Sequence, residues 1–180
     1  GIGFKEQPLQ HDDLRSEILY DLILCCISGG MSRLYRKLYD EGLTNPGFGG
    51  EVLRVDGCCC ILFTGESDVP DTVKQLLLEE IRRIRAEGVD REIFTLYKNE
   101  KYGQLIENLE NVEDSASQMA DFALSGQTVA QQIATLAALT AEDADAALQK
   151  ILSEERMAVM YIQPDGTAGE EPDDEEEMEE

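Results

Sequence analysis

The 180-residue chain contains a single histidine, His11. A zinc peptidase site uses at least two histidine ligands, and a serine-type site needs a histidine base together with a G-x-S-x-G elbow, which is missing here. His11 stands beside two aspartates at the expected start of a helix, where a surface residue is the simpler interpretation. We therefore expect no catalytic residue and no metal ligand in this chain.

Cysteine spacings typical of zinc or redox sites are also missing. The five cysteines form two runs, residues 25–26 and 58–60, and no C-x-x-C pair occurs. Neighbouring residues of a strand point to opposite faces, so the triple run cannot offer three thiols to one metal. Gly29-Gly30 lacks the K-[ST] of a phosphate loop. The thiols are expected to be small buried side chains, kept reduced in a cytoplasmic protein.

Basic residues are scarce. The chain has 15 lysines and arginines against 38 acidic residues, and its formal net charge is −23. Residues 165–180 contain ten acids and no base, which leaves −13 on residues 1–164. Such a body repels phosphate backbones and anionic membrane surfaces, so neither nucleic acid nor a membrane is an expected partner. The composition predicts one domain over residues 1–164, followed by a disordered acidic tail over residues 165–180.

No apolar run approaches the length of a membrane span. The longest runs, residues 22–27 and 58–63, are far shorter than the roughly 18 residues required. No signal peptide is visible. The chain opens with Gly1, inside an apparent strand of residues 1–5, which suggests a piece of a longer polypeptide.

The pattern of elements predicts an α+β fold, with helices packed on a mostly antiparallel sheet. Asp56-Gly57 separates two strands and is the signal of a two-residue hairpin turn. The second strand, CCCILFT, is apolar on both faces and is expected in the middle of a covered sheet. The expected strands cover residues 1–5, 51–55, 58–64 and 156–162. The expected helices begin near Asp12 or Asp13, Met31, Pro70, Asp90, Glu113, Thr128 and Thr140.

Residues 28–45, SGGMSRLYRKLYDEGLTN, are the most informative stretch of the sequence. Gly29-Gly30 breaks the preceding helix. A short amphipathic helix of about residues 31–41 then places Met31, Leu34, Tyr35 and Leu38 on one apolar stripe. Gly42 stands at the position of a helix-ending glycine, and Leu43 restarts the chain as an extended segment.

The order G-G-M-S-R-L-Y-x-x-L-Y-x-E-G-L resembles the helix motif in the C-terminal module of the pitrilysin/insulinase-type (M16) zinc peptidases. The matching residues are Ser32, Arg33, Leu34, Tyr35, Leu38, Gly42 and Leu43. The T-A-E-D sequence at Thr140–Asp143 also resembles the family pattern. The resemblance covers about residues 1–164 and implies an M16 peptidase-like (LuxS/MPP-like) module with its first residues missing.

The resemblance implies a division of labour within a longer protein. The zinc-binding H-x-x-E-H motif of this family lies in the preceding module, so this chain is expected to bind no cofactor and to be inactive alone. Its expected partners are that N-terminal M16 module, a second M16 half, or both. The parent would cleave peptides inside a chamber, with this module as wall and substrate clamp.

Two positions depart from the family motif. Tyr39 stands where many members have an arginine. Asn45, or Pro46 because the spacing is one residue short, stands where they have a tyrosine. In the family, that arginine and that tyrosine reach toward the substrate. The candidate residues facing substrate or partner are Ser32, Arg33, Arg36, Tyr39 and Asn45, and those that shape the motif are Gly29, Gly30, Leu38, Gly42 and Leu43. Arg33, Arg36 and Lys37 also form a basic spot, which is either a docking surface or an ordinary solvated face.

The departures at Tyr39 and Asn45 favour a second interpretation. The family contains degenerate halves that only pair with an active partner. This chain is then a non-catalytic interaction subunit.

Overall fold

The computed structural model describes residues 1–9, 13–55 and 57–163, and its architecture confirms the predicted α+β class. His11, Asp56 and the acidic tail of residues 165–180 lie outside the described residues. The elements in chain order are β1 (Ile2–Glu6), α1 (Leu14–Ser28), α2 (Arg33–Asp40), β2 (Gly49–Val55), β3 (Cys58–Thr64), α3 (Pro70–Glu87), α4 (Arg91–Glu110), α5 (Val112–Leu124), α6 (Val129–Ala138), α7 (Ala141–Leu148), the 3-10 turn η1 (Glu154–Arg156) and β4 (Met157–Val159).

The strands form one antiparallel sheet in the order β2-β3-β1-β4. Val55 pairs with Cys58, so two residues connect β2 to β3, and Gly57 has a φ of +73°. This confirms the predicted hairpin. Because β1 pairs on its other side with β4, the first and last described strands lie next to each other in the sheet. β4 ends at Val159, three residues before the predicted end at Ile162.

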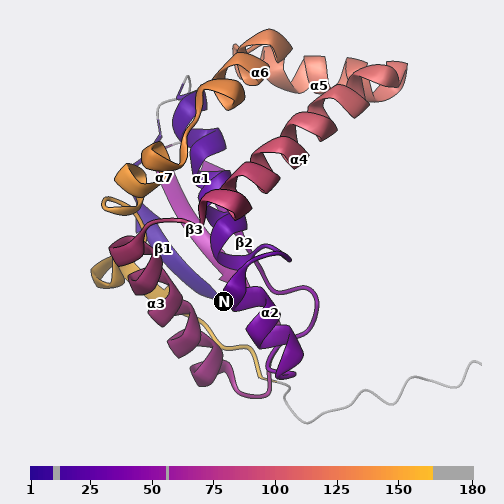
Figure 1. Cartoon of the computed structure of the whole chain (residues 1–180). Coiled ribbons are helices and arrows are strands. Elements are labelled where there is room, and N and C mark those ends of the chain that lie inside the picture. The colour runs from indigo at the N-terminus through magenta and orange to yellow at the C-terminus, as the bar shows by residue number, and fades with distance from the viewer. Residues whose placement is uncertain (10–12, 56, 164–180) are drawn as a thin grey trace, which may run out of the picture.

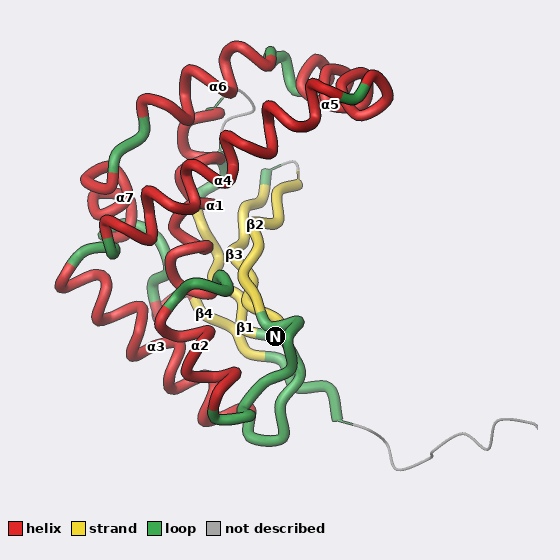
Figure 2. The backbone as a smooth tube through the Cα atoms, turned by 45° about the vertical axis from the view of Figure 1, so that its right-hand side comes forward, coloured by secondary structure: helices red, strands yellow, loops and turns green. Residues whose placement is uncertain are grey.

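Helices cover one face of the sheet (Figures 1 and 2). The alternate residues Phe4, Ile61 and Phe63 point into the core and are buried. Phe4 and Phe63 meet edge to face, with ring centroids 6.1 Å apart. The three cysteines of residues 58–60 point alternately to the two faces of the sheet. Cys59 is fully buried, whereas Cys58 is exposed and Cys60 is half-buried. These thiols are therefore not gathered at one point.

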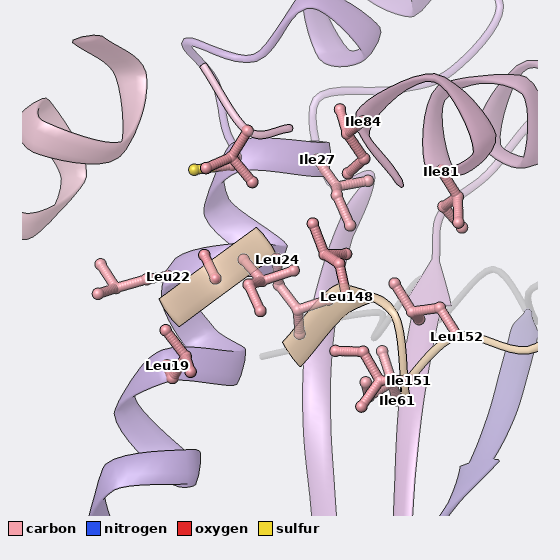
Figure 3. Close-up of a cluster of buried hydrophobic side chains, with 14 of the residues drawn as sticks. Leu19, Leu22, Leu24, Ile27, Ile61, Ile81, Ile84, Leu148, Ile151 and Leu152 are labelled. Atoms are coloured by element: carbon pink, nitrogen blue, oxygen red, sulfur yellow. The ribbon is translucent and has the colours of Figure 1, made fainter. Parts of the chain in front are cut away.

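The core lies between this sheet face, α1, α3 and α7. Figure 3 shows Leu22 and Ile27 of α1, Ile81 and Ile84 of α3 and Leu148 of α7 close together with Ile61 of β3. The described stretch Leu14–Asp40 is long and apolar enough to cross a membrane. However, 56% of its apolar 18-residue window is buried inside the fold. We conclude that α1 supplies the central helix of this core.

Capping side chains set the helix starts. Asp13, Ser32, Asp90, Thr128 and Thr140 each accept a hydrogen bond from a backbone N–H of the helix that they precede. The cap at Ser32 starts α2 two residues later than the predicted Met31. Helix α4 continues through Gly103 without a break.

The far end of α4 and all of α5 project from the body (Figure 1). Phe94 and Tyr97 are the only buried residues of α4, and α5 contributes no buried residue. Ile106 and Met119, which lie on apolar stripes in the sequence, are 36% and 53% exposed. The periodicity predicted both helices correctly but did not show how little of them the body covers.

A partly buried ion pair joins the first strand to the segment that precedes the last strand. The Glu6 carboxylate accepts hydrogen bonds from the Leu152 backbone N–H (2.6 Å) and from the Arg156 guanidinium (2.9 Å). Leu152 has a φ of +60°, unusual for a leucine. Arg85 donates to the carbonyl oxygens of Leu148, Ile151 and Leu152. These contacts fix the turn that leads from α7 toward β4.

Candidate functional site

The site singled out by the sequence is built on α2, which begins after a tightly packed break. Gly29 ends α1, and a Cβ at this position would stand 2.2 Å from the Tyr97 hydroxyl oxygen and 2.6 Å from the Cys25 carbonyl oxygen. The Met31 N–H donates to the same hydroxyl (2.9 Å). Gly29 is therefore required for close packing against α4. Around Gly30 a Cβ would meet nothing within 4 Å.

Ser32 caps the helix. Its side chain accepts a hydrogen bond from the Tyr35 N–H (3.1 Å), and the residue is fully buried. We predicted Ser32 as a residue facing substrate or partner. The structure instead buries Ser32 inside the fold, because the capping side chain must lie against the first turn of α2.

The end of α2 is a Schellman motif. The Leu43 N–H donates to the Leu38 carbonyl (2.8 Å), and the Gly42 N–H donates to the Tyr39 carbonyl (3.0 Å). Gly42 has a φ of +65°, as the helix-ending position requires. Leu38 is fully buried and Leu43 is partly buried against the same core. Leu38, Gly42 and Leu43 thus form the end of α2 and its contact with the core.

The outer face of α2 presents three exposed cations, Arg33, Arg36 and Lys37. None of the three forms an ion pair with another described residue. By contrast, eight other basic side chains of the chain do so, namely Arg15, Arg54, Lys74, Arg82, Arg83, Arg91, Lys101 and Arg156. In a protein with 38 acidic residues, α2 thus retains a local cationic surface.

An aromatic pair flanks these cations. Tyr39 is 55% exposed and stacks on Tyr35, with ring centroids 6.2 Å apart and planes inclined by 6°. The Tyr35 hydroxyl donates to the Pro46 carbonyl (3.1 Å), which anchors the inner ring. The stacked pair therefore places one exposed aromatic ring on the same helix as the cations.

Asn45 is engaged within the fold. Its side-chain amide donates to the Glu66 carboxylate (2.9 Å), and its side-chain oxygen accepts from the Glu66 N–H (3.4 Å). The Asn45 N–H also donates to the Glu66 carbonyl (3.2 Å). Asn45 therefore clamps the segment after α2 to the segment after β3, and both polar atoms of its side chain are used.

No metal centre is formed by the described part of the chain, which contains no group of three or more His, Cys, Asp or Glu side chains placed to hold an ion. Among the thiols, burial raises the pKa of Cys26 to about 12, and burial also raises the pKa of Cys25. A thiol that stays protonated is a poor metal ligand and a poor nucleophile.

A cavity of about 270 Å³, which sequence analysis did not predict, lies between α1, α4, α5 and α6. Its lining includes Gln104, Gln118, Gln132 and the carboxylates of Glu17 and Asp21. Glu17 is paired with Arg54, and Asp21 is paired with Lys101. Both carboxylates thus have a basic partner within the fold, and the rest of the lining is a mixture of amide and apolar side chains.

Comparison with known proteins identifies the family. The family model described as peptidase M16 inactive domain matches residues 1–101, which is more than half of the chain. The zinc protease YmfH of Bacillus subtilis, itself uncharacterised, is 23% identical over 170 residues, which span 91% of this chain and 39% of the relative. The chain therefore covers about two-fifths of that curated relative.

Solved structures share the fold. An M16-like peptidase from Alicyclobacillus acidocaldarius matches with a TM-score of 0.77 and 24% identity, over 87% of this chain and 38% of that chain. The peptidase M16 inactive domain from Pseudomonas fluorescens matches with a TM-score of 0.70 and 16% identity, over 87% and 39% of the respective chains. From the family match and the shared fold, we conclude that this chain belongs to the peptidase M16 inactive domain family.

Proposed function

We propose that this chain is the non-zinc-binding C-terminal module of an M16-type metallopeptidase and forms the wall and substrate clamp of a peptide-cleaving chamber. Membership of the inactive-domain family supports the first part, and the chain's share of its relatives' length supports the presence of further modules in the parent. The zinc and its ligands belong to the preceding module. Five free thiols are compatible with a cytoplasmic location.

The single observation that carries the clamp role is the exposed face of α2. Arg33, Arg36 and Lys37 are cations without a described ion-pair partner, and the stacked Tyr39 lies on the same helix. Both ends of α2 are fixed, by the Ser32 cap and by the Schellman turn at Gly42. A rigid helix that presents cations and an aromatic ring is suited to hold a peptide that carries carboxylates.

The test is reconstitution with the separately expressed N-terminal M16 module of the same protein. Hydrolysis of a fluorogenic acidic peptide is compared for the wild-type chain, the double variant Arg36→Ala/Lys37→Ala, and Lys150→Ala as a control on an exposed lysine elsewhere. The double variant is expected to raise KM severalfold with little change in kcat, since it weakens binding without touching the metal site. Equal KM values for all three chains would refute the clamp role.

A non-catalytic interaction subunit is the second candidate. Two observations favour it: Tyr39 occupies the place of an arginine of many family members, and both polar atoms of the Asn45 side chain are bound to Glu66. In this case the chain still binds an M16 partner. The same reconstitution distinguishes the two functions, because a complex that forms but accelerates no peptide hydrolysis supports the subunit role.

A further inference from the structure

Helix α5 turns an apolar stripe to solvent. The stripe repeats at the spacing of one helix face, and all of its side chains are exposed: Val112, Ala116, Met119 and Ala123. The partly buried positions of α5 lie on another face, and two of them, Gln118 and Phe122, line the cavity between α1, α4, α5 and α6. A surface helix normally directs its apolar face to the core. We call the four exposed residues the arm stripe.

The arm stripe offers the kind of surface on which a second helix packs. Val112 is 86% exposed and Met119 is 53% exposed, and Leu124, which is 83% exposed, follows Ala123 at the end of α5. The alanines of the stripe are short, so the side chains of another helix can pack between the larger residues. Contiguous apolar surface that a chain leaves in water marks a protein–protein contact.

Both ends of α5 are fixed by hydrogen bonds. Asn111 caps the start, where its side-chain oxygen accepts from the Glu113 N–H (2.9 Å). At the other end the Gln127 N–H donates to the Phe122 carbonyl (2.7 Å), and Gly126 has a φ of +69°. The helix is therefore formed before a partner arrives, and little conformational entropy is lost when one binds.

The arm is acidic and has no compensating base. Residues 102–138 contain no lysine or arginine, and they include five carboxylates: Glu107, Glu110, Glu113, Asp114 and Asp121. None of the five forms an ion pair with another described residue. Glu113 borders the arm stripe, since it precedes Ala116 by three residues of the same helix. A partner that matches this surface carries positive charge beside its apolar side chains.

The other surfaces within reach do not meet this requirement. A second arm carries the same sign of charge, and so does the segment of residues 165–180. Helix α2 of a second copy is basic, but its apolar residues Leu34 and Leu38 are buried. Anionic membrane surfaces repel acidic groups. These occupants are therefore disfavoured.

A module connected at either end of the chain would join it far from the arm. The Met160 N–H donates to the Gly1 carbonyl (2.8 Å), so the first residue lies beside the last described segment. In Figures 1 and 2, Gly1 lies near α2, whereas α5 lies at the opposite end of the molecule. This placement favours a separate protein as the partner of the arm stripe.

We infer that the arm stripe is a docking surface for a basic amphipathic helix of a separate protein. The apolar face of that helix packs on Val112, Met119 and Leu124, and its lysine or arginine side chains lie toward Glu110 and Glu113. Recognition of this kind uses aliphatic side chains that repeat along one face of the bound helix. The inference does not depend on the proposed function, because that function concerns α2.

The test measures, by fluorescence anisotropy, how the complete chain binds a labelled synthetic helical peptide with leucines on one face and lysines elsewhere. Met119→Lys is compared with Leu96→Lys, because both add one charge, the two side chains are 53% and 48% exposed, and Leu96 lies on α4 outside the stripe. Met119→Lys is expected to weaken binding about tenfold or more, since it places a like charge inside an apolar contact. Leu96→Lys is expected to bind like the wild type. Far-UV circular dichroism checks that both variants are folded.

A second peptide, with glutamate in place of every lysine, tests the role of charge and is expected not to bind. The inference is wrong if the wild-type chain binds neither peptide, if it binds both equally, or if the two lysine variants lose equal affinity. A chain that is a dimer alone, and that Met119→Lys dissociates, would show that a second copy occupies the stripe. Displacement of the lysine peptide by the separately expressed N-terminal M16 module would show that the parent protein covers it. Either result overturns the inference.

Discussion

At the scale of single residues, the contact between Gly29 and Tyr97 joins the end of α1 to α4. A methyl group at Gly29 would overlap both a rigid backbone carbonyl and the Tyr97 hydroxyl. We expect Gly29→Ala to lower the free energy of unfolding by about 1–3 kcal/mol, the usual cost of overpacking. Urea denaturation measures this. Gly30→Ala is the control, because a Cβ there meets nothing within 4 Å and the midpoint should stay within error; equal effects of the two substitutions would refute the contact.

Gly42 is a second residue whose conformation excludes most side chains. Its φ of +65° is poorly tolerated by a β-branched residue, so Gly42→Val should destabilise the chain by roughly 1 kcal/mol or more. Asparagine accepts this conformation more readily, and Gly42→Asn should cost clearly less. An unchanged denaturation midpoint for the valine variant would mean that the helix end tolerates another conformation.

These two glycines show what local sequence reveals. Gly42 was predictable, because its conformation follows from its place at the end of an amphipathic helix. The importance of Gly29 over Gly30 was not, because it depends on Tyr97, which is 68 positions away in the sequence. The burial of Ser32 was not predictable for a related reason. A serine in a cationic stretch is expected at the surface, and its capping hydrogen bond to the Tyr35 N–H is visible only in the structure.

At the scale of elements, α7 depends on a capping box at its start. The Thr140 side chain accepts from the Asp143 N–H, and Asp143 accepts from the Thr140 N–H (2.9 Å). Thr140→Ala should lower the free energy of unfolding by about 1 kcal/mol. The Thr140 backbone hydrogen bond lowers the pKa of Asp143, and Arg15 adds to this. The stability from Asp143 is then present above about pH 4 and is lost as the pH falls through the lowered pKa.

The pH dependence of urea denaturation between pH 2 and 6 checks this prediction. Asp143→Asn should flatten the acid side of the stability curve. Glu142→Gln is the control, because it removes a carboxylate from the same turn without breaking the capping box. A curve for Asp143→Asn that falls as steeply as the wild type would show that Asp143 does not contribute.

Elements with strong end signals were predicted well, and the exceptions have physical causes. The stripe of α3, with Val73, Leu77 and Ile81, is buried as its spacing requires. Helix α5 also has helical spacing of apolar residues, but it buries none of them, because it lies on a projecting arm that the body does not cover. The pair of Glu6 with Arg156 was not predictable, since it joins residues that only the sheet brings together.

At the scale of the whole molecule, the acidic tail should be dispensable for stability. Residues 165–180 carry ten carboxylates that repel one another, and Met178 is their only large apolar side chain. Their ordering, at about 1–2 kcal/mol per residue, would have little hydrophobic compensation. Truncation after Pro164 is expected to leave the denaturation midpoint unchanged. A loss of stability at low salt that disappears at high salt would instead indicate docking on Arg33, Arg36 and Lys37.

The order of the elements in the sequence predicted the fold class. It did not predict that one face of the sheet is left without helices. The sequence CCCILFT predicted an inner strand covered on both faces; β3 is an inner strand, but the described chain covers one face. A sequence pattern indicates that a strand face is apolar, but it does not indicate which segment packs against that face.

Metal analysis tests whether the zinc site belongs to another module. The chain is dialysed against zinc, desalted in the presence of a mild chelator, and its zinc content is measured by inductively coupled plasma mass spectrometry. The described residues form no ligand cluster and the sequence has one histidine, so the expected content is far below one zinc per chain. One tightly bound zinc per chain, retained in the variant His11→Ala, would show that this chain holds a zinc site of its own.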